Sequence, residues 1–206
     1  PPVAAVSLSA AQLAAGFVSN LQLIGSAQTY NLTINAASNA SLDLSAWTFS
    51  DWNVNTAIIV QGGGGAQTFT GSSQRDVLLG AGGNDTLIGA AGNDTLIGGL
   101  GVDTLTGGTG TDGFRGSAAE LNGDTITDLS VGDRIVFADA SLGSFNFSLS
   151  GSTLNFTGGS LTLQNLPSGM KLVASAVSGG GVMLQLAAAS VPGAFNADFN
   201  GDGRSD

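Results

Sequence analysis

The 206-residue chain contains no cysteine and no histidine, and it carries little positive charge. The absence of cysteine excludes disulfide bonds and thiolate chemistry and is compatible with an extracellular protein. Zinc and copper sites are disfavoured as well, because thiolate and imidazole are their usual ligands. Five Lys and Arg residues stand against 15 Asp and Glu, for a formal net charge of -10. The basic residues are scattered, so nucleic acid is not an expected partner.

Large side chains and long apolar runs are also scarce. The chain has ten Phe, two Trp and one Tyr, but 33 Gly. Small side chains and frequent turns favour many short strands over long helices. No apolar run reaches the roughly 18 residues of a transmembrane helix. The first residues lack Met and the basic region of a signal peptide, which we interpret as an internal boundary of a longer protein.

A nine-residue repeat occupies the centre of the sequence. Five nonapeptides in one register begin at Gly71, Gly80, Gly89, Gly98 and Gly107. Position six of each unit is an aspartate: Asp76, Asp85, Asp94, Asp103 and Asp112. Position eight is apolar: Leu78, Leu87, Leu96, Leu105 and Phe114. An earlier unit that begins at Gly62 keeps Phe69 at position eight but has Gln67 at position six.

A nine-residue period fits a six-residue turn followed by a three-residue strand. Glycine at positions one and four permits positive φ in the turn. Side chains alternate along a strand, so position eight points inward. Successive strands then lie on opposite walls of a flattened coil of two units, and parallel strands of one wall stack about 4.8 Å apart. We therefore predict an all-β fold, a right-handed parallel β-roll or β-helix with a C-terminal antiparallel β cap.

This coil would stack like charges on each edge. Asp76, Asp94 and Asp112 share one edge, while Asp85 and Asp103 share the other. Two carboxylates about 5 Å apart repel by roughly 1 kcal/mol in bulk water and about 3 kcal/mol at an effective dielectric of 20. A cation must lie between them, and an all-oxygen cage of carboxylates and turn carbonyls suits Ca²⁺. Ordinary solvated turn aspartates are the alternative, which fits a single turn better than five in register.

The units GAGGNDTLI, GAAGNDTLI and GGLGVDTLT resemble the repeats-in-toxin (RTX) nonapeptide GGxGxDxUx, which binds Ca²⁺ in a parallel β-roll. The resemblance spans Gly62 to Arg115. It implies a secreted or cell-surface bacterial protein, exported by type I machinery and folded by calcium outside the cell. Gln67 weakens or abolishes a site at its turn. The candidate ligands are Asp76, Asp85, Asp94, Asp103, Asp112, Gly71, Gly80, Gly82, Gly89, Gly98, Gly107, Asn84 and Asn93.

Residues 1–61 are predicted to continue the coil as an irregular β-helix without the calcium motif. Short strands are expected at residues 29–34, 41–44 and 57–60. The stretch SLSAAQLAAGF favours a short helix that closes the open end, capped by Ser7 or Ser9. The aromatic residues Trp47, Phe49 and Trp52 are assigned to a wider turn or a cap, with a sugar-stacking platform as the alternative.

The roll is expected at 62–116 and a capping β region at 117–189. The segment DTITDLSVGDRIVF resembles the one that closes the roll in many family members. Its aspartates, Asp124, Asp128 and Asp133, either bind a further ion or flank strand ends. From Phe145 on, FNFSLS, STLNFTG, SLTLQNL and GGVMLQL predict antiparallel hairpins that cover the unpaired edge of the last coil.

Residues 190–206 read as a linker followed by a truncated calcium-loop-like motif. The terminal DFNGDGRSD resembles the loops of FG-GAP or VCBS-type repeats. Without the strand that follows in those repeats, the loop is either a calcium site or empty and disordered. Its candidate ligands are Asp198, Asn200, Asp202 and Asp206.

Catalysis is not predicted, because the chain offers one Glu and no His or Cys as acid, base or nucleophile. A β-helical polysaccharide lyase that uses Arg75 or Arg115 as its base is an alternative, but no second basic residue lies nearby. We predict a non-catalytic, structural or assembly module of an adhesin or surface-layer protein. The alternative is an accessory secretion or glycan-binding domain of an exported enzyme, such as a protease, lipase or polysaccharide-modifying enzyme.

Position nine of the repeats is expected to face outward, yet Leu79 and Ile97 are apolar and stack on one wall. Exposed apolar ladders mark contact surfaces. We therefore expect self-association or a contact with neighbouring domains of the parent protein on this wall.

Overall fold

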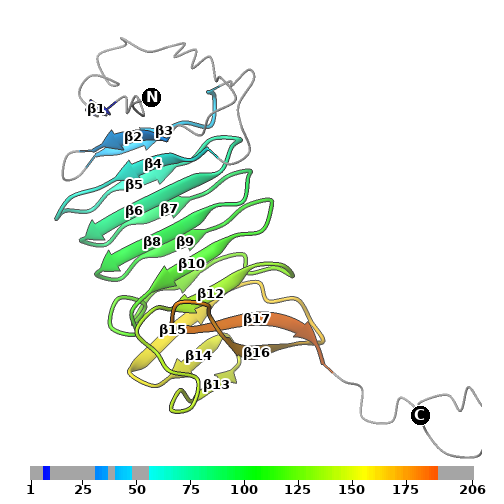
Figure 1. Ribbon diagram of the computed structural model, residues 1–206. Helices are drawn as coiled ribbons and strands as arrows, with labels where there is room; N and C mark the ends of the chain where they lie inside the picture. Colours follow the sequence, from blue (N-terminus) through cyan, green and yellow to red (C-terminus); the bar gives the residue numbers. More distant parts are fainter. Residues whose placement is uncertain (1–6, 10–30, 37–39, 48–55, 190–206) are drawn as a thin grey trace, which may run out of the picture.

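The computed structural model describes residues 7–9, 31–36, 40–47 and 56–189, and all its regular elements there are β-strands in two sheets (Figure 1). In spatial order, the first sheet contains β1 (Ser7–Ser9), β2 (Leu32–Asn35), β4 (Ile58–Gln61), β6 (Asp76–Gly82), β8 (Thr95–Leu100), β10 (Gly113–Gly116), β12 (Arg134–Phe137), β17 (Val182–Ala188) and β16 (Met170–Ala176). The second contains β13 (Phe147–Ser150), β14 (Thr153–Phe156), β15 (Gly159–Leu163), β11 (Thr125–Ile126), β9 (Thr104–Thr106), β7 (Thr86–Ile88), β5 (Thr68–Thr70) and β3 (Ser41–Asp43).

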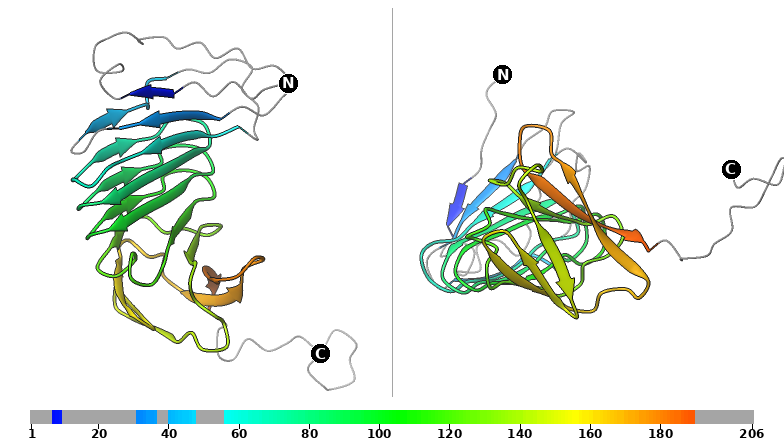
Figure 2. Two further views of the ribbon diagram at one scale, coloured as in Figure 1. Left: turned by 60° about the vertical axis from the view of Figure 1, so that its left-hand side comes forward. Right: turned by 90° about the horizontal axis from the view of Figure 1, so that it is seen from below.

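The register between strands establishes the coil that the nine-residue period predicts. In one wall Val77 of β6 lies beside Thr95 of β8. In the other wall Thr86 of β7 lies beside Thr104 of β9. From β2 to β12, consecutive strands of the chain alternate between the walls, and the coils stack along one axis (Figure 2). The predicted parallel β-roll is therefore confirmed.

The coils are longer on both sides of the repeats. Upstream, Leu32 pairs with Ile58 and Leu42 pairs with Phe69, so these coils carry extra turn residues. Downstream, Phe114 of β10 pairs in parallel with Ile135 of β12. The two sheets thus run unbroken through the repeats and beyond them.

The core is a column of position-eight side chains between the two walls. All five side chains have an exposed fraction of 0%: Leu78, Leu87, Leu96, Leu105 and Phe114. Phe69 of the unit without aspartate continues the column and is equally buried. The outward residues Leu79, Ile88 and Ile97 are half-buried. Alternation along three-residue strands therefore sorts the side chains as the sequence pattern predicts.

Antiparallel strands close the end of the roll, as predicted. In the first sheet β12 pairs antiparallel with β17, and β17 with β16. In the second sheet β13, β14 and β15 form an antiparallel meander, and β15 joins the roll by pairing in parallel with β11. Phe137 packs against Phe145 and Phe156 at ring-centroid distances of 4.8 and 4.6 Å. These rings fill the space below the last coil.

The N-terminal end differs from the expected helical cap where the structure describes it. Ser7–Ser9 is strand β1, paired in parallel with β2, rather than the start of a helix. The backbone donors and acceptors on the edge of β2 need partners, and β1 provides them by pairing there. The rest of the expected helix, together with Phe49 and Trp52, lies outside the described residues, whereas Trp47 packs partly buried against the core. Among the residues described, no helix has the length and hydropathy to cross a membrane.

Candidate metal centre

The turns of the repeats contain positions with positive φ, which glycine adopts freely and other residues adopt only with strain. Position four has positive φ in four successive turns, at Gly83, Gly92, Gly101 and Gly110. Position two also has positive φ, at 78° in both Ala81 and Ala90. An L-residue in this region is strained by about 1 kcal/mol or more. The strain indicates that the turn shape is held by interactions with the neighbouring coils.

Position-six aspartates form a hydrogen-bonded ladder along each edge of the roll. All five are buried, with exposed fractions of at most 2%. The Oδ1 atom of Asp94 accepts a hydrogen bond from the backbone N–H of Asp76, 18 residues earlier, at 2.7 Å. Asp112 accepts from Asp94 at 2.9 Å, and on the other edge Asp103 accepts from Asp85 at 2.7 Å. Asp85, Asp94, Asp103 and Asp112 thus each hold the preceding coil in register.

The second carboxylate oxygen has a different environment. Within the described residues, the Oδ2 atoms of Asp85, Asp94, Asp103 and Asp112 are buried and receive no hydrogen bond. The described residues also contain no group of three or more acidic side chains around one point. Any further ligands would therefore be backbone oxygens, neutral side-chain oxygens or water.

Backbone oxygens do lie beside these carboxylates, around the glycine at position one. At Gly89, a Cβ atom would lie 2.5 Å from the carbonyl oxygen of Gly107 and 2.6 Å from Oδ2 of Asp94. Gly80 has the same two kinds of neighbour, the carbonyl oxygen of Gly98 and Oδ2 of Asp85. Two acceptor oxygens thus lie close together where the glycine has no side chain. A hard cation with oxygen ligands fits this arrangement.

The electrostatics of the ladder agree with this interpretation. Burial, with smaller contributions from the charges of Asp76 and Asp112, raises the pKa of Asp94 to about 8. Burial also raises the pKa of Asp76 to about 6. The pKa values of Asp85, Asp103 and Asp112 are raised for the same first reason. Without a cation the folded roll favours neutral carboxyl groups, and a cation would favour the charged form.

Two turns depart from the pattern. Gln67 places its amide Oε1 2.7 Å from the Cβ position of Gly62, where the other turns place a carboxylate oxygen. Both polar atoms of this amide are buried without a partner among the described residues. In the next turn, Ser72 donates its N–H at 2.7 Å and its hydroxyl at 3.0 Å to Oδ2 of Asp76. Oδ1 of Asp76 remains buried without a donor.

The asparagine candidates connect turns one coil apart. Oδ1 of Asn84 accepts the N–H of Val102 at 3.0 Å, and Oδ1 of Asn93 accepts the N–H of Thr111 at 2.9 Å. Gly82 donates its own N–H to the carbonyl oxygen of Gly63. These contacts orient the turns.

Three aspartates beyond the repeats separate into two kinds. Asp128 uses both carboxylate oxygens to accept the N–H groups of Gly107 and Gly108, at 2.8 and 2.7 Å. Asp124 and Asp133 instead extend the two aspartate ladders. Their positions relative to the strands account for this difference, because Asp124 and Asp133 directly precede a strand, as most repeat aspartates do, whereas Asp128 follows one. The candidates Asp198, Asn200, Asp202 and Asp206 lie outside the described residues.

Sequence reasoning missed the donor serines, Ser72 and Ser130. Each lies three or four residues before a ladder aspartate and hydrogen-bonds to its carboxylate. Serine followed after three or four residues by aspartate at a turn is a local hydrogen-bonding signal that would have found them.

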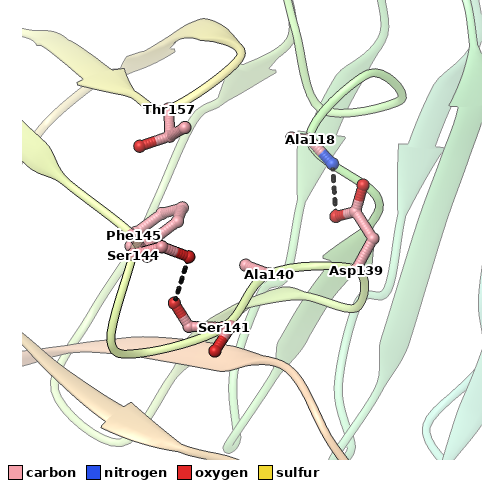
Figure 3. A pocket seen from close by; sticks show the side chains of 7 residues that line it. All are labelled: Ala118, Asp139, Ala140, Ser141, Ser144, Phe145 and Thr157. Carbon is pink, nitrogen blue, oxygen red and sulfur yellow. Dashed lines mark hydrogen bonds between the residues drawn. The ribbon is translucent and has the colours of Figure 1, made fainter.

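One hollow of about 250 Å³ lies in the capping region, away from the ladders (Figure 3). Its lining carries one carboxylate, Asp139, which accepts the N–H of Ala118 at 2.9 Å. Phe145, Ser144 and Thr157 lie around it. A second hollow, of about 290 Å³, lies over the turns beside Arg75 and Asn93.

Fold and site together define a parallel β-roll with buried carboxylates on both edges. A family model, the RTX calcium-binding nonapeptide repeat in four copies, matches residues 61–96 and 80–114. This part of the chain therefore consists of RTX calcium-binding repeats, and Ca²⁺ is its cofactor. A search of curated proteins and a search of solved structures found no match to the chain.

Proposed function

We propose that this chain is a non-catalytic module that folds on binding Ca²⁺ and serves as a structural or assembly unit of a secreted or cell-surface bacterial protein, of the adhesin or surface-layer kind. The observation that carries the proposal is the unpartnered carboxylate oxygen in four successive turns, each buried beside a glycine.

The proposed ligands are the Oδ2 atoms of Asp85, Asp94, Asp103 and Asp112, together with glycine carbonyl oxygens of the turns. The pair around Gly89, Asp94 and the carbonyl of Gly107, is the clearest example. A cation there satisfies both acceptors and neutralises the stacked charge. Because the ligands come from different coils, the site exists only in the folded chain, and binding free energy becomes folding free energy.

The same coupling favours a location outside the cell. RTX repeats are typical of secreted proteins. Extracellular calcium modules bind with dissociation constants of roughly 10⁻⁴ to 10⁻³ M. A roll held together by such sites would remain unfolded where calcium is scarce and fold after export.

A structural role is supported by how the acidic side chains are used. Most of the described aspartates are acceptors for backbone N–H groups of a neighbouring coil, such as Asp94 and Asp103. A carboxylate that holds the register of the fold is not available as a general acid or base. The chain has no His or Cys to take that role.

Circular dichroism of the full chain in excess chelator tests the proposal. We expect the β signal to disappear in chelator and to return on addition of Ca²⁺. Mg²⁺ at the same concentration is the control, and it should restore little, because it requires strict octahedral geometry and gives up water reluctantly. A β spectrum that is unchanged by chelator, or restored equally by Mg²⁺, would contradict the proposal.

A further inference from the structure

The aspartate ladders continue past the end of the nonapeptide repeats. The family match ends at residue 114, but Asp124 and Asp133 occupy the next position on each edge. Oδ1 of Asp124 accepts the N–H of Asp103 at 2.8 Å, and Oδ1 of Asp133 accepts the N–H of Asp112 at 2.8 Å. Both are buried, with exposed fractions of 0% and 1%. By these measures the two residues are equivalent.

Their second carboxylate oxygens are not equivalent. Oδ2 of Asp133 accepts the N–H of Ser130 at 2.8 Å and its hydroxyl at 2.9 Å. Oδ2 of Asp124 is buried and has no donor among the described residues. A buried acceptor without a partner is destabilising by about 1–3 kcal/mol, and more if it is charged. Asp133 is therefore satisfied by the protein itself, whereas Asp124 requires a partner from outside.

Asp124 shares two features with the aspartates of the repeats. Its neighbour one coil earlier, Asp103, also has a buried Oδ2 without a donor in the described part of the chain. The two carboxylates are linked by the N–H of Asp103, the same link that joins Asp85 to Asp103. Asp124 thus repeats, outside the motif, the ladder hydrogen bond and the buried, unpartnered oxygen for which a cation is proposed inside it.

We propose that Asp124 is a ligand of a further calcium site outside the nonapeptide repeats, on the edge that carries Asp85 and Asp103, and that Asp133 binds no ion. This inference rests on the proposed function, because it extends the same calcium chemistry by one coil. On the other edge, donors from Ser72 and Ser130 close the first and last carboxylates, Asp76 and Asp133.

The position of Asp124 connects the proposed site to the antiparallel cap. Its backbone carbonyl oxygen accepts the N–H of Thr162 at 2.8 Å, and the next residue, Thr125, pairs with Thr162 in β15. A cation that fixes Asp124 therefore also fixes the strand on which the antiparallel meander docks. Calcium at this site joins the cap to the roll.

The test counts bound ions by native mass spectrometry of the full chain saturated with Ca²⁺. Asp124→Asn should bind one Ca²⁺ fewer than the wild type, and matched Asp133→Asn should bind the wild-type number. Asp124→Glu keeps a carboxylate and should retain the ion, which separates loss of a ligand from misfolding.

Three results have distinct meanings. A wild-type ion count for Asp124→Asn, as expected if Asp124 is only a buried neutral acid, would overturn the inference. Equal losses for Asp124→Asn and Asp133→Asn would also overturn it, because the serine donors would then not matter. A wild-type chain that binds no Ca²⁺ would instead contradict the proposed function itself.

Discussion

At the scale of single residues, four ladder aspartates have two tasks, one for each oxygen: Asp85, Asp94, Asp103 and Asp112. Oδ1 accepts a backbone N–H from the neighbouring coil, as Asp94 does from Asp76. Oδ2 faces the glycine at position one and a carbonyl of the following coil, as Asp94 faces Gly89 and Gly107. Among the described residues, serine donors replace the second interaction at the two ends of one edge, at Asp76 and Asp133. Within the nonapeptide turns, the glycine provides the space beside the carboxylate.

Replacing Gly89 by alanine tests the importance of this space. The new Cβ would meet two oxygens at 2.5 and 2.6 Å, so the coils must separate or the carboxylate must move. We expect Gly89→Ala to raise the calcium midpoint of folding and to lower stability by roughly 1–3 kcal/mol, as overpacking does. Gly64→Ala is the matched control, because a Cβ there meets nothing within 4 Å. Calcium titrations followed by circular dichroism measure both; indistinguishable midpoints would contradict the role assigned to Gly89.

At the scale of elements, the repeat strands of the second sheet, β5, β7 and β9, are only three residues long and contribute one inward side chain each. Such a strand is unstable alone, and it is held by its parallel neighbours and by the apolar column. The roll should therefore be sensitive to the loss of one inward side chain and insensitive to changes on the outer face.

Leu96→Ala and Thr95→Ala compare the two faces of β8. Leu96 is fully buried, so its truncation should lower the free energy of unfolding by about 2–5 kcal/mol. Thr95 is half-buried on the outer face, and its replacement should change the free energy by less than about 1 kcal/mol. Urea denaturation in saturating Ca²⁺ measures both. Similar values for the two variants would argue against a column in which one side chain per strand makes the core.

At the scale of the whole molecule, a rise in pH should destabilise the folded, calcium-free chain, whereas added calcium should stabilise the fold. The pKa values of Asp94, Asp124 and Asp76 are about 8, 7 and 6, each above the ordinary value of 3.8, and burial is the first cause. The folded, calcium-free chain therefore binds protons more tightly than the unfolded chain. The stability that protonation provides is complete below about pH 4, and it is lost as the pH rises through the folded-state values toward 8.

We accordingly expect the calcium-free chain to show more β structure at pH 4–5 than at pH 8. Calcium requires deprotonated carboxylates, so the calcium midpoint of folding should rise as the pH falls from 8 to 5. Circular dichroism across this range, with chelator and with Ca²⁺, measures both trends. If β content in chelator increases with pH, the carboxylates are not buried as described.

Most of the roll was predictable because the repeat is local and strict. The position-eight column and the stacking of aspartates two units apart follow from counting residues. The N-terminal segment was less predictable. Ser7–Ser9 reads as a helix start by local propensity, but it lies beside an unpaired sheet edge, and pairing with β2 prevails. The antiparallel cap was predictable from alternation, whereas β16 was not, because only one of its seven residues is buried.

The sequence by itself determined the coil, its inward column and its demand for a cation, because a nine-residue period with glycine, aspartate and an apolar residue in fixed places allows few other arrangements. Tertiary structure decided which carboxylate oxygens receive a hydrogen bond from the protein and which are left for a cation. Asp124 and Asp133 both directly precede a strand and occupy equivalent ladder positions, but the three-dimensional turn brings Ser130 onto Asp133. Among the described residues, it leaves one oxygen of Asp124 buried and unpartnered. Hydrogen-bond satisfaction depends on where donors lie in space, which the period does not specify.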